Sequence, residues 1–100
     1  MIRGTTPTHI FNIPLAASEI KEIKITYSQN GSVVLSKKKG DCEIIDNVVT
    51  VTLSQEDTFK FNSAMHVKIQ MRVMTNTGCV MGSKTMTVSV DDCLDSEVLI

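Results

Sequence analysis

Strict alternation of apolar and polar side chains over residues 65–75 constrains the fold of this chain more than any other feature. In the stretch MHVKIQMRVMT the apolar residues are Met65, Val67, Ile69, Met71 and Val73. The polar residues between them are His66, Lys68, Gln70 and Arg72. Successive side chains of a strand point to opposite faces of its sheet, so this period of two predicts a strand with one buried and one solvated face.

The same period recurs along most of the chain, and no stretch has the length and 3.6-residue period of a long helix. The predicted strands are a leading strand at 9–13, a hairpin that begins with 20–28, a hairpin over 42–53, and a hairpin that joins 65–75 to about 79–90. A chain of 100 residues suggests one domain. About seven short strands therefore predict an all-β, immunoglobulin-like β-sandwich over residues 1–100, with 91–100 as a C-terminal tail.

The first hairpin turns at Gln29-Asn30-Gly31, and two registers are open. A two-residue loop would place Tyr27 opposite Val34 and Ile25 opposite Ser36. A three-residue loop would pair Tyr27 with Val33 and Ile25 with Leu35. The second register keeps both apolar sets on one face, so we expect the three-residue loop.

The second hairpin has a clearer pattern, CEII-DN-VVTVTL. A two-residue turn at Asp46-Asn47 pairs Ile44 with Val49 and Cys42 with Val51, and keeps Leu53 on the same side. Ser54 then precedes two acids, which is typical of a helix N-cap, so one or two short helical turns are expected over 55–61. Phe59 and Phe61 are expected to close that end of the core.

In the third hairpin, Met86, Val88 and Val90 are expected to face inward, and Gly82 indicates a bulge or kink. There is no Trp and no cysteine pair suited to bridging the sheets, two features of antibody domains. The core is therefore expected to depend on aliphatic and methionine packing.

Composition excludes several classes of function. Ten Lys and Arg against eleven Asp and Glu give a net charge of −1, which argues against a nucleic-acid partner. No apolar run approaches the roughly 18 residues of a membrane span, and polar residues interrupt the N-terminal stretch that could pass for a signal peptide. Three cysteines without a CxxC pair favour free thiols over disulfides or zinc. We expect a chain made and kept in a cytoplasm until it assembles.

Residues for catalysis are sparse. The sequence contains no GxSxG, P-loop, HExxH or paired-carboxylate pattern. His9 and His66 are isolated and are expected to be exposed, and Cys42 is expected to be an inert apolar filler. We therefore predict no catalytic, cofactor-binding or metal-binding residue, and a protein that is not an enzyme.

Two surface features have both a structural and a functional interpretation. The polar row His66, Lys68, Gln70 and Arg72 is either the wet face of a half-buried sheet or, with Lys84 on the paired strand, a basic strip for an acidic partner. The lysines at 37–39 are expected to be solvated in a loop rather than to form a binding patch.

The C-terminal tail is more informative. Residues 91–100, DDCLDSEVLI, hold four acids and no base, which leaves seven acids against ten bases in the rest of the chain. Leu94, Val98, Leu99 and Ile100 are aliphatic residues that either fold back on the sandwich or are covered by another molecule. We expect a homo-oligomer, or docking on a like subunit, through this tail.

Six segments, spread nearly from end to end of the chain, carry a resemblance: MIRGTTPTHIF, ITYSQNG, VLSKK, LSQEDTFKF, IQMRVMTNTG and CLDSEV. Together they resemble a family of small proteins encoded in prophages of gut-type Firmicutes. More loosely, the chain is similar to the immunoglobulin-like N-terminal domain of phage baseplate upper proteins, which is an adaptor.

The resemblance implies a non-enzymatic structural or adaptor protein of a phage tail or baseplate, located in the virion and assembled in the bacterial cytoplasm. Its partners would be other virion proteins or copies of itself. The alternative is a phage-encoded binding module for a host protein or glycan.

Overall fold

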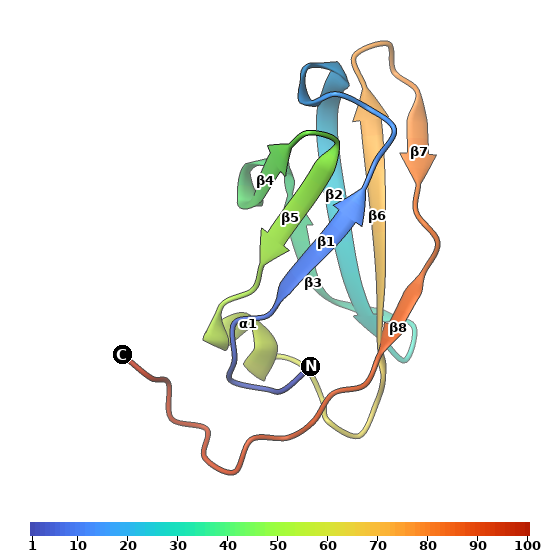
Figure 1. The fold of residues 1–100 in the computed structure, drawn as a ribbon. Coiled ribbons are helices and arrows are strands. Elements are labelled where there is room, and N and C mark those ends of the chain that lie inside the picture. The colour runs from blue at the N-terminus through green and yellow to red at the C-terminus, as the bar shows by residue number, and fades with distance from the viewer.

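The computed structural model describes all 100 residues as two antiparallel sheets that face each other (Figure 1). Two 3-10 turns, η1 (Ala17–Glu19) and η2 (Lys39–Asp41), and one short helix, α1 (Gln55–Phe59), connect the strands. The strands are β1 (Thr8–Asn12), β2 (Ile20–Gln29), β3 (Ser32–Lys38), β4 (Cys42–Ile45), β5 (Val48–Thr52), β6 (Val67–Thr75), β7 (Val80–Gly82) and β8 (Met86–Val88).

The strand order assigns the fold. One sheet has the order β1-β5-β4, and the other has the order β3-β2-β6-β7, with β8 also paired to β6. An immunoglobulin variable-type sandwich sets strands B, E and D against strands C′, C, F and G. The two sheets match that order strand for strand, with β7 and β8 as two parts of strand G. The predicted immunoglobulin-like sandwich is confirmed, and the first hairpin fits because the variable type keeps C and C′ in one sheet.

The chain departs from the variable type in two places: no strand C″ lies between β3 and β4, and strand A is displaced. No strand lies beside the free edge of β1. Residues 1–3 instead run parallel to residues 89–91, where Arg3 N donates to Asp91 O at 3.0 Å and Asp91 N donates to Met1 O at 2.8 Å. The two ends of the domain are thereby joined beside α1.

The core fills the space between the sheets with side chains from the inward face of each strand, as the period of two predicts. Its centre is Tyr27 on β2, which is fully buried. The Tyr27 hydroxyl lies 2.8 Å from His9 Nδ1, and its ring packs against Phe61 with centroids 5.9 Å apart. His9 is thus half-buried and bonded to the core, so the expectation that it is exposed was wrong.

The second hairpin has the predicted register, with Cys42 opposite Val51 and Ile44 opposite Val49. Asp46 and Asn47 both have positive φ, 47° and 66°, as a two-residue type I′ turn requires. Downstream, Ser54 caps α1 as expected: its Oγ accepts from Asp57 N at 3.1 Å, and the Asp57 carboxylate accepts from Ser54 N at 3.0 Å.

The two phenylalanines near α1 have different positions. Phe61 is buried and closes the core as predicted, whereas Phe59 is only half-buried. The Phe59 ring lies against Gly4, where an added Cβ would be 2.7 Å from the ring at a φ of +78°. The Arg3 guanidinium lies 5.5 Å from the centroid of the same ring. Phe59 therefore anchors the N-terminal segment instead of the core.

Both registers considered for the first hairpin were wrong. Asn30 and Gly31 form a two-residue turn with φ of 50° and 78°, and Gln29 pairs with Ser32. One extra residue, Val34, then bulges out of the ladder, so that Tyr27 pairs with Leu35. The bulge keeps Tyr27 and Leu35 on the buried face, which the three-residue loop was expected to achieve.

The same bulge changes the environment of the lysines. Ile25 pairs with Lys37, so Lys37 lies on the inner face, where its Nζ is 2.8 Å from an Asp57 carboxylate oxygen. Lys38 ends β3, and Lys39 Nζ donates to Ile20 O at 2.7 Å. The prediction of three solvated loop lysines was therefore wrong for Lys37, which is half-buried in the ion pair, and β3 extends through Lys38. Lys38 and Lys39 are exposed as expected, and of the two only Lys38 makes no contact through its ammonium.

The third hairpin is interrupted after Gly82, as its glycine indicated. Ser83 bonds twice to Met71, which separates β7 from β8. Val90 is buried and Val88 half-buried as expected, but Met86 is 38% exposed. The predicted burial of Met86 was therefore wrong. Met86 lies on β8, an outer strand of the larger sheet, and the facing smaller sheet has no strand beyond β1 that would cover it.

Replacing Lys37 by Ala should lower the free energy of unfolding by about 2–3 kcal/mol, because the Asp57 carboxylate would stay largely buried without its cation. The Lys38→Ala variant is the matched control and should change stability by less than about 0.5 kcal/mol. Urea denaturation of both variants measures the difference. Equal effects of the two substitutions would contradict the ion pair.

Stability should also fall in mild acid because of His9. Burial, and secondarily the positive charge of the N-terminus, lowers the pKa of His9. In the unfolded chain His9 titrates near its usual value of about 6.5. At a pH between that pKa and the lower pKa of the folded state, the unfolded chain binds more protons than the folded chain. The contribution of His9 to the free energy of unfolding is therefore complete above about pH 6.5 and is lost as the pH falls. Between pH 7.5 and pH 5.0, urea unfolding should show a smaller loss of unfolding free energy for His9→Gln than for the natural chain.

Candidate interaction surface

The polar row predicted from the alternation lies on the outer face of the larger sheet. Lys68, Gln70 and Arg72 alternate along β6 with buried residues, and His66 directly precedes the strand. All four side chains are exposed. The interpretation of this row as the solvated face of a half-buried sheet is therefore correct. Whether the face also binds a partner depends on which residues the neighbouring strands place beside it.

Arg72 is one end of a row of three cations across three strands. In the sheet register Lys24 of β2 lies directly opposite Arg72 of β6, and Lys38 of β3 lies directly opposite Lys24. Residues that pair in this way have Cβ atoms about 4.5–5.5 Å apart. Sequence reasoning missed Lys24 and Lys38 as neighbours of Arg72, because the β2–β6 register places Lys24 beside Arg72 and the bulged β2–β3 register places Lys38 beside Lys24. We call Lys38, Lys24 and Arg72 the cation row.

No acid of the chain neutralises the cation row. The two ion pairs of the structure are Arg3 with Asp92 and Lys37 with Asp57, and neither includes a member of the row. Glu22 lies two residues from Lys24 on the same strand without pairing with it. Like charges placed directly opposite each other destabilise a sheet, so the row costs stability unless an anion covers it.

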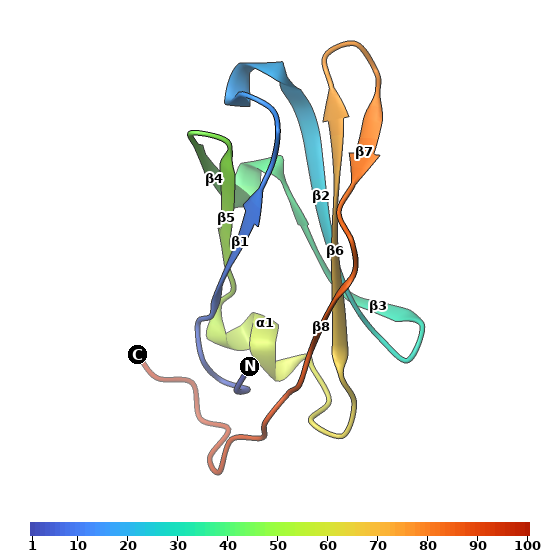
Figure 2. The same ribbon diagram turned by 45° about the vertical axis from the view of Figure 1, so that its right-hand side comes forward.

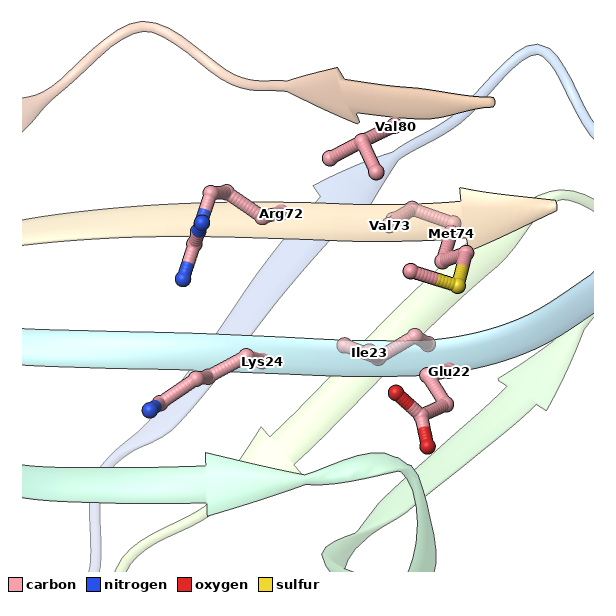
Figure 3. A pocket seen from close by; sticks show the side chains of 7 residues that line it. All are labelled: Glu22, Ile23, Lys24, Arg72, Val73, Met74 and Val80. Carbon is pink, nitrogen blue, oxygen red and sulfur yellow. The ribbon is translucent and has the colours of Figure 1, made fainter. Parts of the chain in front are cut away.

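A shallow depression of about 160 Å³ lies beside the cation row (Figure 3). Lys24 and Arg72 project at one end of it, and Met74, Val80 and the Glu22 carboxylate lie at the other end. Buried Ile23 and Val73 lie between the two ends. Val80 is 55% exposed. We call this depression the outer-face pocket; it combines two cations with an uncovered aliphatic side.

Lys84 is not part of this arrangement. It lies in the connection between β7 and β8, not on a paired strand, and its side chain makes no hydrogen bond or ion pair. The carbonyl oxygen of the neighbouring Ser83 instead accepts a hydrogen bond from Gln70 Nε2 at 3.1 Å. The predicted placement of Lys84 on the paired strand beside the polar row was therefore wrong, and the cations that lie beside Arg72 are those of β2 and β3.

The C-terminal tail leaves the domain beside α1 and does not fold back on either sheet (Figures 1 and 2). Its root is fixed by Arg3, whose Nη1 lies 2.6 Å from Asp92 Oδ1. Farther along, Gln55 of α1 exchanges two hydrogen bonds with the backbone of Leu99, at 2.8 and 2.7 Å. Leu94, Leu99 and Ile100 are each at least 77% exposed, and Val98 is 37% exposed. Leu94, Leu99 and Ile100 are thus uncovered by their own chain, whereas Val98 is partly covered.

The remaining candidate residues do not gather into a chemical site. Cys42 is half-buried, and burial, followed by the charge of Asp41, raises the pKa of its thiol, so the thiol stays protonated. Cys79 and Cys93 are free thiols at other places on the chain. No three His, Cys, Asp or Glu side chains come close enough together to hold a metal ion. None of the helices is long and apolar enough to cross a membrane.

Comparisons with known proteins add little to the geometry. No protein-family model matches the chain, and no curated protein matches it. A solved structure that is similar is the V domain of amphioxus IgVJ-C2, with 11% identical residues and a TM-score of 0.37. The match covers 89% of this chain and 95% of that one. The fold assignment rests on the strand order of the chain itself, not on this weak likeness.

Repulsion within the cation row should lower the stability of the domain. Replacing Lys24 by Glu turns two like-charged cross-strand pairs into two opposite-charged pairs, and should raise the free energy of unfolding by about 0.5–1 kcal/mol at low salt. Lys21→Glu is the control, because Lys21 is exposed on the same strand and has no partner in the register. Urea denaturation in 20 mM and 500 mM salt checks both variants. A destabilised Lys24→Glu protein would show that the row is not repulsive.

Proposed function

We propose that this protein is a non-enzymatic structural or adaptor subunit that acts through protein-protein contacts, and that its C-terminal tail carries the main contact. The observation behind the proposal is the aliphatic set of the tail: the domain leaves Leu94, Leu99 and Ile100 uncovered and covers Val98 only in part. Full burial of one such side chain contributes about 1.5–3 kcal/mol before ordering costs. A partner that covered the set would gain a contact strong enough to order the tail.

The setting we propose is a phage particle, with the protein as a small tail or baseplate component. The support is the resemblance of the sequence to small prophage-encoded proteins and to the adaptor domain of baseplate upper proteins. Copies of the chain itself are the first candidate partner, because the acidic tail and the more basic body complement each other in charge.

The alternative of a glycan-binding module has less support. Glycan-binding sandwiches usually present aromatic platforms, and here Phe11, Tyr27 and Phe61 are buried. Phe59 is half-buried beneath Gly4 and Arg3. No aromatic side chain is therefore free to stack on a sugar, although binding to a host protein would not need one.

Deleting residues 92–100 should leave the sandwich folded and reduce the mass in light scattering from that of an oligomer to that of a monomer. The deletion removes the tail and its bond to Gln55 but no core side chain. The control is Val33→Ser with Ile45→Ser, which removes two exposed aliphatics elsewhere and should keep the oligomer. A full-length protein that is already monomeric at high concentration and low salt would refute self-association through the tail.

The proposed setting has its own test. In bacteria that carry the gene within an inducible prophage, the chain should sediment with purified particles at a fixed ratio to known tail proteins. Particles assembled with the protein deleted from 92 to 100 should lack it. Its absence from purified particles, with the protein present in the lysate, would rule out a virion component and leave an assembly or regulatory role.

A further inference from the structure

We propose that the outer-face pocket and the adjoining cation row receive the C-terminal segment 94–100 of a second copy of this chain. The proposal rests on the self-association proposed above and adds the place where the tail docks. It makes Lys24 and Arg72 the receiving residues and Asp95 and Glu97 the donated charges. The expected contact is head-to-tail, with the tail of one copy on the sheet of the next.

The chemistry of the two surfaces is complementary. The pocket has the cations Lys24 and Arg72 at one end, and Met74, the exposed aliphatic Val80 and the Glu22 carboxylate at the other, so the acids of a docked segment belong at the cationic end. The segment LDSEVLI has two carboxylates followed by three aliphatic residues. Neither Asp95 nor Glu97 has an ion-pair partner in its own chain, whereas Asp92 already pairs with Arg3. The unpaired acids of the chain's tail thus match the unpaired cations of its sheet.

The position of the tail disfavours docking within one molecule. The tail leaves the sandwich at the α1 end, whereas Arg72 and Met74 lie toward the other end of β6 (Figures 1 and 2). From Val67 to Arg72 the strand rises about 17 Å. Arg3 holds the root of the tail, and Gln55 holds Leu99 beside α1, which directs the segment away from its own pocket. Donor and acceptor therefore lie near opposite ends of the molecule.

A contact of this kind is heterologous. Each copy offers one tail and one pocket, so a chain of contacts closes into a ring if the rotation between copies permits, and otherwise extends as a filament. The aliphatic burial supplies the affinity, and the charges fix the orientation of the segment and weaken as salt screens them.

The test uses two variants, and each of them alters one side of the contact. The acceptor variant carries Lys24→Glu and Arg72→Glu, and the donor variant carries Asp95→Lys and Glu97→Lys. Each alone should be monomeric in light scattering at a concentration where the natural protein is oligomeric. Mixed in equal amounts, they should regain the natural mass with the two variants alternating, because the intact tail fits the intact pocket and the reversed tail fits the reversed pocket.

Two further proteins make the result specific. Combining all four substitutions in one chain reverses both charges and should restore the oligomer. Lys21→Glu with Lys60→Glu changes the net charge as much as the acceptor variant does but lies outside the pocket, and should leave the natural mass. Far-ultraviolet circular dichroism melts confirm that every variant is folded.

The outcomes separate this proposal from the previous one. If the deletion of 92–100 yields monomers but the acceptor variant keeps the natural mass, the tail docks elsewhere and the outer-face pocket serves a different partner. If the two variants stay monomeric when mixed, the pairing of this pocket with this tail is wrong. If the natural protein is monomeric, both proposals fall together.

Discussion

One extra residue in β3 determines how several distant parts of the molecule are arranged. Val34 bulges between the pairs Ser28 with Val33 and Tyr27 with Leu35, and every later residue of the strand changes face as a result. Lys37 then turns inward to Asp57, and Lys38 turns outward beside Lys24. Without the bulge Lys37 would face solvent and Lys38 the core. The ion pair and the cation row both depend on it.

The inward lysine connects the two halves of the structure. Asp57 belongs both to the capping box of α1 and to the ion pair with Lys37, so it joins the crossing between the sheets to the edge strand β3. Burial by itself would raise the pKa of Asp57, but the hydrogen bonds from Lys37 and Ser54 outweigh burial and lower it. A sandwich without Trp or a disulfide thus has a fixed polar link between β3 and α1, whereas antibody domains have a covalent link between strands B and F.

Sequence patterns predicted the strands, the second hairpin and the cap at Ser54, because each depends on local signals such as alternation or the Asp46-Asn47 turn. They failed at the first hairpin, where Val33, Val34 and Leu35 are three consecutive apolar residues. The alternation pattern does not determine which of three consecutive apolar residues faces inward, so it could not predict the bulge. The cation row was missed for the same reason, since Lys38 and Arg72 are 34 positions apart in sequence and meet only through Lys24.

The charges of the molecule are arranged so that its own fold cannot neutralise them. Three cations lie in line across β3, β2 and β6, where each opposes a like charge. Three acids without ion pairs lie in a tail that Arg3 and Gln55 hold beside α1. A single copy keeps both groups solvated, and their attraction is then screened within about 10 Å at ordinary salt. Contact between copies would remove the repulsion within the row and cover the aliphatic residues of the tail in the same step, so the two unfavourable features of the isolated molecule would offset each other only in an assembly.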